Sequence, residues 1–241
     1  MKILSIILSL FLSIYSFAAK DLIVGICADN PPFEFVDQTK RDFFVGFDVD
    51  LINAIGEELG RKVKIQNMKF SSLLPALTSN RIDLVISGIS ATKERSQNVT
   101  FSKGYINASM SFLLKKNFKI KSLNDLEGKI IGVQAGSNWH LFAFDLSKKI
   151  KDLRIKAIED NLLLVEDVKA GRIDGLLLEK PQVKRFLSMY TYLESFDIKE
   201  PGKPLSIVLR KNDPLEKQVN AAIDSLKKKG IIDSLAKKWL R

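Results

Sequence analysis

Residues 82–95, IDLVISGISATKER, join an apolar run to a polar turn that ends in an arginine. The run 82–86 predicts a buried strand, and the small polar residues after it predict a turn at the strand's carboxyl end. In an open α/β sheet, such turns present backbone N–H groups to a ligand. Arg95 offers two parallel N–H donors that match a carboxylate or a phosphate. The segment therefore indicates either an anion pocket or an ordinary loop in which Thr92 caps a helix.

A second segment, 172–179 (RIDGLLLE), repeats the pattern of 81–87 (RIDLVIS). Each follows a short segment with helical periodicity, and each ends at a polar residue. Around them, apolar runs alternate with amphipathic segments in the order βαβα, which is typical of a parallel sheet covered by helices. The two similar half-units predict an α/β protein with two lobes.

Two stretches predict crossings between these lobes. Residues 105–115 form a long extended segment that leads from the first lobe into the second, and the proline-containing segment 200–204 leads back to the first. We therefore expect lobe 1 to comprise residues 20–108 and 203–241, and lobe 2 to comprise residues 109–202. Two crossings form a hinge, and a ligand held between hinged lobes is trapped when they close.

The first 19 residues have the features of a secretory signal peptide. Met1 and Lys2 give a positive start, an apolar run follows, and Ser16-Phe17-Ala18-Ala19 offers small residues for cleavage. The apolar run is short for a membrane anchor, which needs about 20 residues. We expect a protein that is exported to the periplasm and is soluble there.

Composition excludes several classes of function. The formal net charge is +10, but the lysines are spread over amphipathic segments and no nucleic-acid-reading motif accompanies them. We therefore expect no nucleic-acid partner. Cys27 and His140 are the only residues of their kinds, so an intrachain disulfide is impossible, and zinc sites and hydrolytic triads are hard to build. We expect no metal and no cofactor, while carboxylate-based chemistry remains possible.

The polar residues at strand ends suit a free amino acid. Arg95, with Ser90 and nearby N–H groups, would neutralise its carboxylate. Ser137 and Asn138 begin a predicted helix in the other lobe, whose N-terminus favours the same anion. Glu179 would pair with the ammonium group, or else it is a surface acid at a helix start. Phe70 could pack on the ligand's carbon chain, although an isolated aromatic residue usually belongs to the core. Trp139 carries the same ambiguity.

Several motifs together resemble one family. They are 32–34 (PFE), 45–51 (VGFDVDL), 82–95, 126–129 (LEGK), 132–137 (GVQAGS) and 170–174 (AGRID). In this order they resemble the polar amino-acid-binding, or family 3, solute-binding proteins of ABC importers, over nearly the whole mature chain.

The resemblance implies a type II periplasmic-binding-protein fold with two hinged lobes, each a mainly parallel sheet flanked by helices. It also implies a membrane permease as partner. By the same resemblance, Arg95 binds the α-carboxylate, Glu179 binds the α-ammonium and Phe70 packs on the ligand. Residues that line the site from the first lobe would be Ser87, Gly88 and Ser90, and Ser137 would donate from the second.

Two positions depart from the family pattern. Asn30 stands where an aromatic residue is common, which favours a ligand with a polar or charged side chain. Glu179 stands where many relatives have Asp. Its longer arm still reaches an ammonium group, and it also resembles what a catalytic acid needs.

We therefore predict a non-enzymatic, monomeric binding protein that captures a polar L-amino acid and delivers it to an ABC importer. Asp29 and Glu34 could meet a basic side chain such as that of arginine or lysine, whereas glutamine fits Asn30. The alternative is a cyclohexadienyl dehydratase, an exported enzyme of similar fold that acts on prephenate or arogenate.

Overall fold

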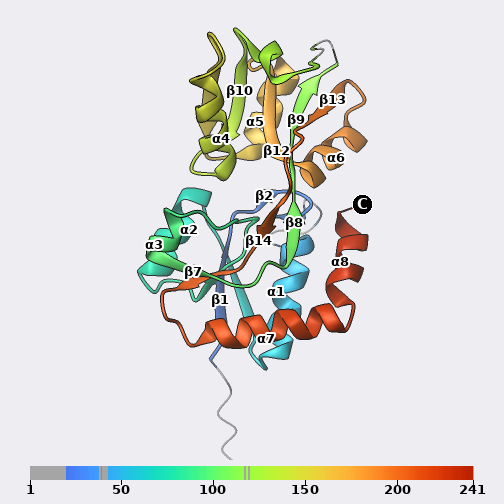
Figure 1. Cartoon of the computed structure of the whole chain (residues 1–241). Helices are drawn as coiled ribbons and strands as arrows, with labels where there is room; N and C mark the ends of the chain where they lie inside the picture. The colour runs from blue at the N-terminus through green and yellow to red at the C-terminus, as the bar shows by residue number, and fades with distance from the viewer. Residues whose placement is uncertain (1–19, 38, 40–42, 117, 119, 241) are drawn as a thin grey trace, which may run out of the picture.

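The computed structural model describes residues 20–37, 39, 43–116, 118 and 120–240, so the predicted signal peptide lies outside the described residues. The chain folds into two lobes stacked one above the other, with both termini of the described chain in lobe 1 (Figure 1). Within the described ranges, no helix is long and apolar enough to cross a membrane. The two-lobed α/β architecture predicted from the sequence is confirmed.

Lobe 1 is built on a mixed sheet with helices on both faces. Its strands lie in the order β5 (Val63–Asn67), β1 (Leu22–Ile26), β6 (Leu84–Val85), β15 (Val208–Arg210) and β7 (Val99–Phe101). Strand β1 is parallel to β5 and β6, and β15 runs antiparallel to β6 and β7, so the sheet is mainly parallel. One face is covered by α1 (Phe47–Glu58), α7 (Leu215–Lys228) and α8 (Ile231–Trp239), and the other by α2 (Phe70–Thr78). The short helix α3 (Arg95–Asn98) lies beside β7.

Lobe 2 repeats this plan. Its strands lie in the order β11 (Arg154–Ile158), β10 (Ile130–Gln134), β12 (Gly175–Glu179), β9 (Met110–Lys115) and β13 (Leu193–Asp197), with β9 antiparallel to its neighbours. Helix α4 (Asn138–Ser147) and the 3₁₀ turn η1 (Leu123–Leu126) pack on one face, and α5 (Asn161–Ala170) and α6 (Lys180–Met189) on the other. Side chains alternate along β9, so that Phe112 and Leu114 enter one core and Leu113 the other. Burial on both faces explains why these strands read as continuous apolar runs.

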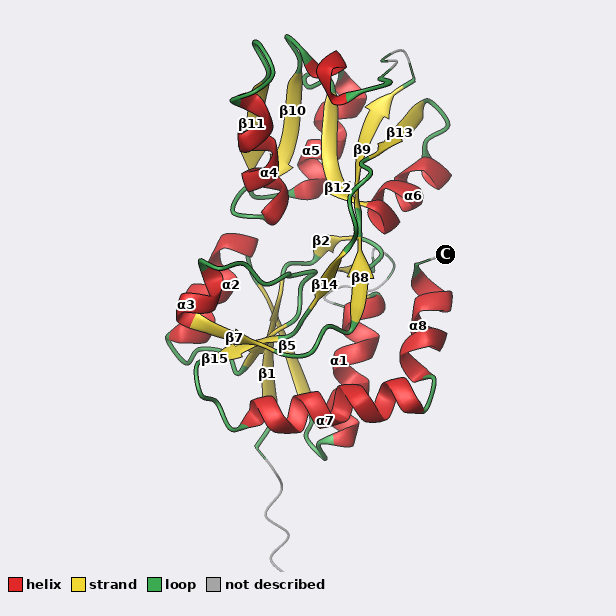
Figure 2. Ribbon diagram, viewed as in Figure 1, coloured by secondary structure: helices red, strands yellow, loops and turns green. Residues whose placement is uncertain are grey.

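Two antiparallel strands cross between the lobes. They are β8 (Ile106–Ala108) and β14 (Lys203–Leu205), which pair Ala108 with Lys203 and run through the waist of the molecule (Figure 2). The lobe limits that we predict from the sequence fall on this pair, and the division itself stays a prediction. A small sheet of β2 (Asp29–Asn30), β3 (Glu34–Val36) and β4 (Phe44–Val45) lies on the lobe 1 side of the crossing.

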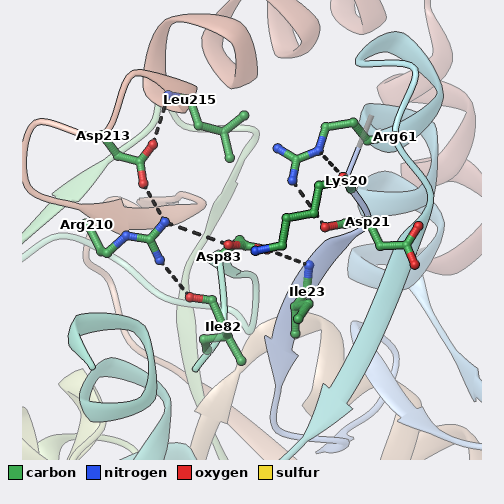
Figure 3. A network of polar contacts seen from close by, with 9 residues as sticks. All are labelled: Lys20, Asp21, Ile23, Arg61, Ile82, Asp83, Arg210, Asp213 and Leu215. Atoms are coloured by element: carbon green, nitrogen blue, oxygen red, sulfur yellow. Dashed lines mark hydrogen bonds and ion pairs between the residues drawn. The ribbon is translucent and has the colours of Figure 1, made fainter. Parts of the chain in front are cut away.

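The echoed RID segments occupy equivalent places. Strands β6 and β12 each lie in the middle of their sheet's strand order. Just before β6, Asp83 accepts a hydrogen bond from the backbone N–H of Ile23 at 3.0 Å, at the base of lobe 1 (Figure 3). Before β12, Asp174 accepts one from the N–H of Ile130 at 2.8 Å. The repeated aspartate therefore binds the backbone of the neighbouring strand in both lobes.

Candidate functional site

A cavity lies between the lobes where the carboxyl ends of the parallel strands of both sheets meet. Its free volume is about 20 Å³, room for about one water molecule, so the lining side chains nearly fill it in this arrangement of the lobes. Its lining comes from both lobes and comprises Asn30, Phe70, Ser87, Gly88, Arg95, Gln134, Ser137, Asn138, Trp139, Asn161 and Glu179. This is the position at which open α/β sheets bind ligands.

The lobe 1 wall is built by the turn after β6. The Ser87 hydroxyl donates to Glu34 Oε1 at 2.6 Å and accepts from the N–H of Cys27. Gly88 has a φ of +55°, and a Cβ there would come within 3.0 Å of the Asn30 amide, so glycine suits both the backbone and the close approach. The Gly88 N–H already donates to Asp48 at 3.0 Å. Our expectation that the N–H groups of this turn are free for a ligand is therefore wrong for Gly88.

Arg95, at the start of α3, reaches across the opening between the lobes. Its guanidinium donates to the carbonyl of Ser90 at 2.9 Å and to the carbonyl of Gly136 in lobe 2 at 2.9 Å. It also lies 5.7 Å from the ring centroid of Phe70, which is within cation–π distance. Burial lowers the pKa of Arg95, but an arginine stays charged in proteins. The remaining N–H groups of the guanidinium can still meet a carboxylate.

The lobe 2 wall begins at the N-terminus of α4. Ser137 caps this helix: its hydroxyl oxygen accepts from the N–H of His140 at 3.1 Å and its O–H donates to the Gln134 carbonyl at 2.7 Å. Trp139 is buried and donates its indole N–H to Glu179 Oε1 at 2.8 Å. Trp139 is thus both a core residue and a cavity residue, because its ring packs in the lobe 2 core and also lines the cavity.

Glu179 is the last residue of β12 and the N-cap of α6. Its backbone N–H donates to the Gln182 side-chain oxygen at 3.2 Å, and its carboxylate accepts in return from the backbone N–H of Gln182. The side chain is 7% exposed. Burial raises the pKa of Glu179 to about 7, partly opposed by its hydrogen bonds. A buried carboxylate in such surroundings is poised to pair with a cation.

A layer of buried acids stands directly behind the lobe 1 wall. Glu34 and Asp48 are fully buried, and burial raises the pKa of both. Among the described residues, Glu34 Oε2 and Asp48 Oδ1 have no other hydrogen-bond partner, so a proton shared between the two carboxyl groups would satisfy both. Tyr105 donates its hydroxyl to Asp48 at 3.0 Å. Asp29, whose pKa burial raises to about 6, lies in the adjoining strand.

Most predicted site residues come together, and three do not reach the cavity. Those that line it are Asn30, Phe70, Ser87, Gly88, Arg95, Ser137, Asn138 and Glu179. Asp29 and Glu34 lie behind the wall, bonded to residues that line it. Ser90 is buried and supports Arg95 through its carbonyl group.

Sequence reasoning missed Gln134 and Asn161 and left Trp139 undecided. Gln134 ends β10, and Asn161 opens α5 directly after β11. The rule that ligands bind at the carboxyl ends of parallel strands, applied to every strand of lobe 2, would have found both residues. In the ranges that the structure describes, no group of three or more His, Cys, Asp and Glu side chains is arranged to hold a metal ion.

Comparison with known proteins gives a consistent family. The family model of bacterial extracellular solute-binding proteins, family 3, matches residues 22–241. The arginine-binding extracellular protein ArtP of Bacillus subtilis (strain 168) is 35% identical over 225 residues, which cover 91% of this chain and 86% of that protein. A probable histidine-binding protein of Campylobacter jejuni is 34% identical over 220 residues, covering 90% and 83%.

Solved structures agree with these matches. An ancestral arginine-binding protein bound to arginine superposes with a TM-score of 0.87 at 33% identity, covering 92% of this chain and 98% of that one. The type II periplasmic-binding-protein fold and the family resemblance seen in the motifs are therefore confirmed. This chain belongs to the bacterial extracellular solute-binding proteins of family 3.

Proposed function

We propose that this protein captures a cationic L-amino acid, arginine or lysine, between its two lobes and delivers it to an ABC importer. In this proposal Arg95 holds the α-carboxylate and Glu179 the α-ammonium. The lobes comprise residues 20–108 with 203–241 and residues 109–202, and they close on the ligand about β8 and β14.

The charged groups in and behind the cavity are the observation that favours a cationic ligand. Among the described residues that line the cavity, Arg95 is the only cation. The Glu179 carboxyl group lines the same cavity, and the carboxyl groups of Asp29, Glu34 and Asp48 are buried behind its lobe 1 wall. Burial raises the pKa of all of them, so a cation placed nearby would stabilise their charged forms. A ligand with a second positive charge would supply what the site lacks.

The names of the relatives support the same choice. ArtP is named as an arginine-binding protein, and the ancestral protein was solved with arginine bound. Glutamine offers N–H donors to the lining amides but brings no net charge. It is therefore the second ligand to test.

The dehydratase alternative fits the charge balance less well. Prephenate carries two carboxylates, whereas the described residues that line the cavity include one guanidinium, that of Arg95, and one carboxyl group, that of Glu179. A second carboxylate would have no cation of its own in this lining and would lie near the Glu179 carboxyl group. We therefore propose that Glu179 binds and does not catalyse.

Export through residues 1–19, a monomeric state and a membrane permease as partner belong to the same proposal. They follow from the signal-like N-terminus and from the family. Size-exclusion chromatography of the mature chain would test the monomer.

Calorimetric titration tests the ligand. The mature protein is unfolded and refolded to remove carried-over ligand, and then titrated with arginine, lysine, glutamine, prephenate and arogenate. We expect binding of a cationic amino acid at about micromolar Kd or tighter, which corresponds to roughly 8 kcal/mol.

Replacing Arg95 supplies the matched comparison. Arg95→Ala should weaken binding at least about 100-fold, because it removes the charge that faces the α-carboxylate. Arg81→Ala is the control, since Arg81 is an exposed arginine of the same lobe that lies outside the cavity. Unchanged affinity in Arg95→Ala, or consumption of prephenate by the wild type, would contradict the proposal.

A further inference from the structure

We propose that Asp29 and Glu34 act as positioning residues that turn the lining amides of Gln134 and Asn30, so that their carbonyl oxygens face the ligand. The inference rests on the proposed function and sharpens it. The side chain of the ligand would have to offer several N–H donors, and a neutral side chain of the same shape with a carbonyl group would be rejected.

The orientation of Gln134 follows from its partners. Its amide nitrogen Nε2 lies 3.0 Å from Asp29 Oδ2, 3.3 Å from Asp29 Oδ1 and 3.3 Å from the carbonyl oxygen of Glu159. An ionised carboxylate and a carbonyl accept hydrogen bonds and donate none. Both therefore require the nitrogen on their side. The oxygen Oε1 is the group that Gln134 has left for the cavity that it lines.

Asn30 is fixed in the same way from lobe 1. Its nitrogen Nδ2 donates to Glu34 Oε1 at 3.1 Å, and the same oxygen accepts the Ser87 hydroxyl. The other atom of the amide, Oδ1, is buried and has no hydrogen-bond partner among the described residues. A buried acceptor without a donor costs free energy unless a ligand supplies one. Asn30 therefore presents an unfilled acceptor at the cavity wall.

Asp29 also makes the arrangement depend on closure of the lobes. It belongs to β2 of lobe 1, yet its Oδ2 accepts from the backbone N–H of Asn161 in lobe 2 at 2.9 Å. Gln134, which it orients, likewise belongs to lobe 2. The Asn161 side-chain oxygen is a further buried acceptor without a described partner. Closure thus brings the orienting carboxylate and the amide together, and it completes an acceptor-lined wall.

Arginine and citrulline test this directly, because they have the same shape. Citrulline replaces one terminal N–H group of the guanidinium by a carbonyl oxygen and carries no side-chain charge. Wild-type protein should bind arginine far more tightly than citrulline. In Asp29→Asn, the new amide can accept from Asn161 and donate to Gln134 Oε1, which would turn the Gln134 nitrogen toward the cavity.

Calorimetry with both ligands gives the decisive number, which is the ratio of the two Kd values. We expect Asp29→Asn to lower the preference for arginine at least about tenfold, the effect of one lost and one misdirected hydrogen bond. Damage to the fold alone would weaken both ligands alike and leave the ratio unchanged. Asp160→Asn is the matched control, since Asp160 caps the same helix through Leu162 and Leu163 and does not line the cavity.

Each other outcome decides the matter. An unchanged ratio in Asp29→Asn overturns the inference. If that variant does not fold, Gln134→Leu should lower the same ratio, and an unchanged ratio there overturns it as well. A wild type that binds glutamine or citrulline as tightly as arginine would overturn the inference and leave amino-acid capture standing. Absence of any amino-acid binding would overturn both.

Discussion

Strand β6 in lobe 1 and strand β12 in lobe 2 hold the same place in their sheets, yet the chain leaves them differently. The shared plan extends to glycines in the adjoining strands. A Cβ on Gly25 would lie 2.5 Å from Ile82 Cδ1, and one on Gly132 would lie 2.6 Å from Ile173 Cδ1. In both lobes, the isoleucine of the RID segment thus packs directly against a glycine of the neighbouring strand, where a side chain would clash.

The upper ends of the two strands carry opposite charges to the cavity. After β6 the chain continues as a polar turn toward Arg95, and donors of that turn are taken by Glu34 and Asp48 behind it. After β12 the chain enters α6 at once, and Glu179 caps that helix while facing the cavity. The same half-unit therefore supplies a cation from one lobe and an anion from the other, as a zwitterionic ligand requires.

The lower ends differ in how firmly they are fastened. In lobe 1, the Arg210 guanidinium donates to the carbonyl of Ile82 at 2.8 Å (Figure 3). It also forms ion pairs with Asp213 at 2.8 Å and with Asp83 at 3.8 Å. In lobe 2, the corresponding Asp174 has Lys129 at 3.9 Å, and both side chains are 36% exposed. Arg210 of strand β15, which comes late in the chain, thus holds the base of lobe 1 together. The Lys129–Asp174 pair at the same place in lobe 2 is longer and more exposed.

The largest effect that we expect concerns Glu179 at the upper end of lobe 2. Its pKa of about 7 in the folded protein lies above the value near 4.3 that an unfolded chain has. Between these values the folded state holds a proton that the unfolded state has lost. The free energy of unfolding of the ligand-free protein should therefore fall as pH rises from about 4.5 to about 7.

Glu179→Gln removes this titration and keeps the acceptor for Trp139. At pH 8 the ligand-free variant should be more stable than the wild type by up to about 3 kcal/mol, and at pH 4 the two should agree. Urea unfolding at pH 4 to 8 measures the difference. Glu200→Gln, a change at an exposed acid, is the control. If the free energy of unfolding depended on pH in the same way for wild type and Glu179→Gln, burial would not raise the pKa of Glu179.

The next effect compares the repeated aspartates. Asp83→Ala should cost about 2–3 kcal/mol, because it leaves the Ile23 N–H without its acceptor and weakens the Arg210 cluster. Asp174→Ala should cost about 1 kcal/mol, since its carboxylate is more exposed and water can reach the Ile130 N–H. Urea unfolding midpoints of the two variants check the order. Equal losses would mean that the two bases are equivalent.

Sequence patterns predicted the repeat and most of the cavity for a physical reason. The RID segments and the strands after them are local signals, since apolar runs, turns and caps are set by neighbouring residues. Glu179 ends the second of these strands and Arg95 follows the turn after the first, and both line the cavity. The rule that strand ends meet at one edge then brings them together.

What the sequence did not predict depends on contacts between distant segments. Asp29 reads as a ligand residue at a strand end, but it is saturated by Gln134 and Asn161, more than 100 positions away. The Gly88 N–H likewise donates to Asp48, which lies in helix α1, 40 positions away. No local pattern reveals that a polar group already has a partner, because the partner arrives only with the tertiary fold.

The smallest effect concerns the cations at the two bases. Arg210→Ala should lower the free energy of unfolding by about 1–2 kcal/mol, because a partly buried guanidinium then no longer joins the Ile82 carbonyl to Asp213. Lys129→Ala should cost less than about 0.5 kcal/mol, as expected for an exposed pair at 3.9 Å. Added salt separates the cases further, since it should weaken the exposed pair and leave the hydrogen-bonded cluster largely intact. If both variants lose the same small amount of stability, the contacts of Arg210 in β15 do not stabilise lobe 1. The two lobes would then differ only at the strand ends that face the cavity.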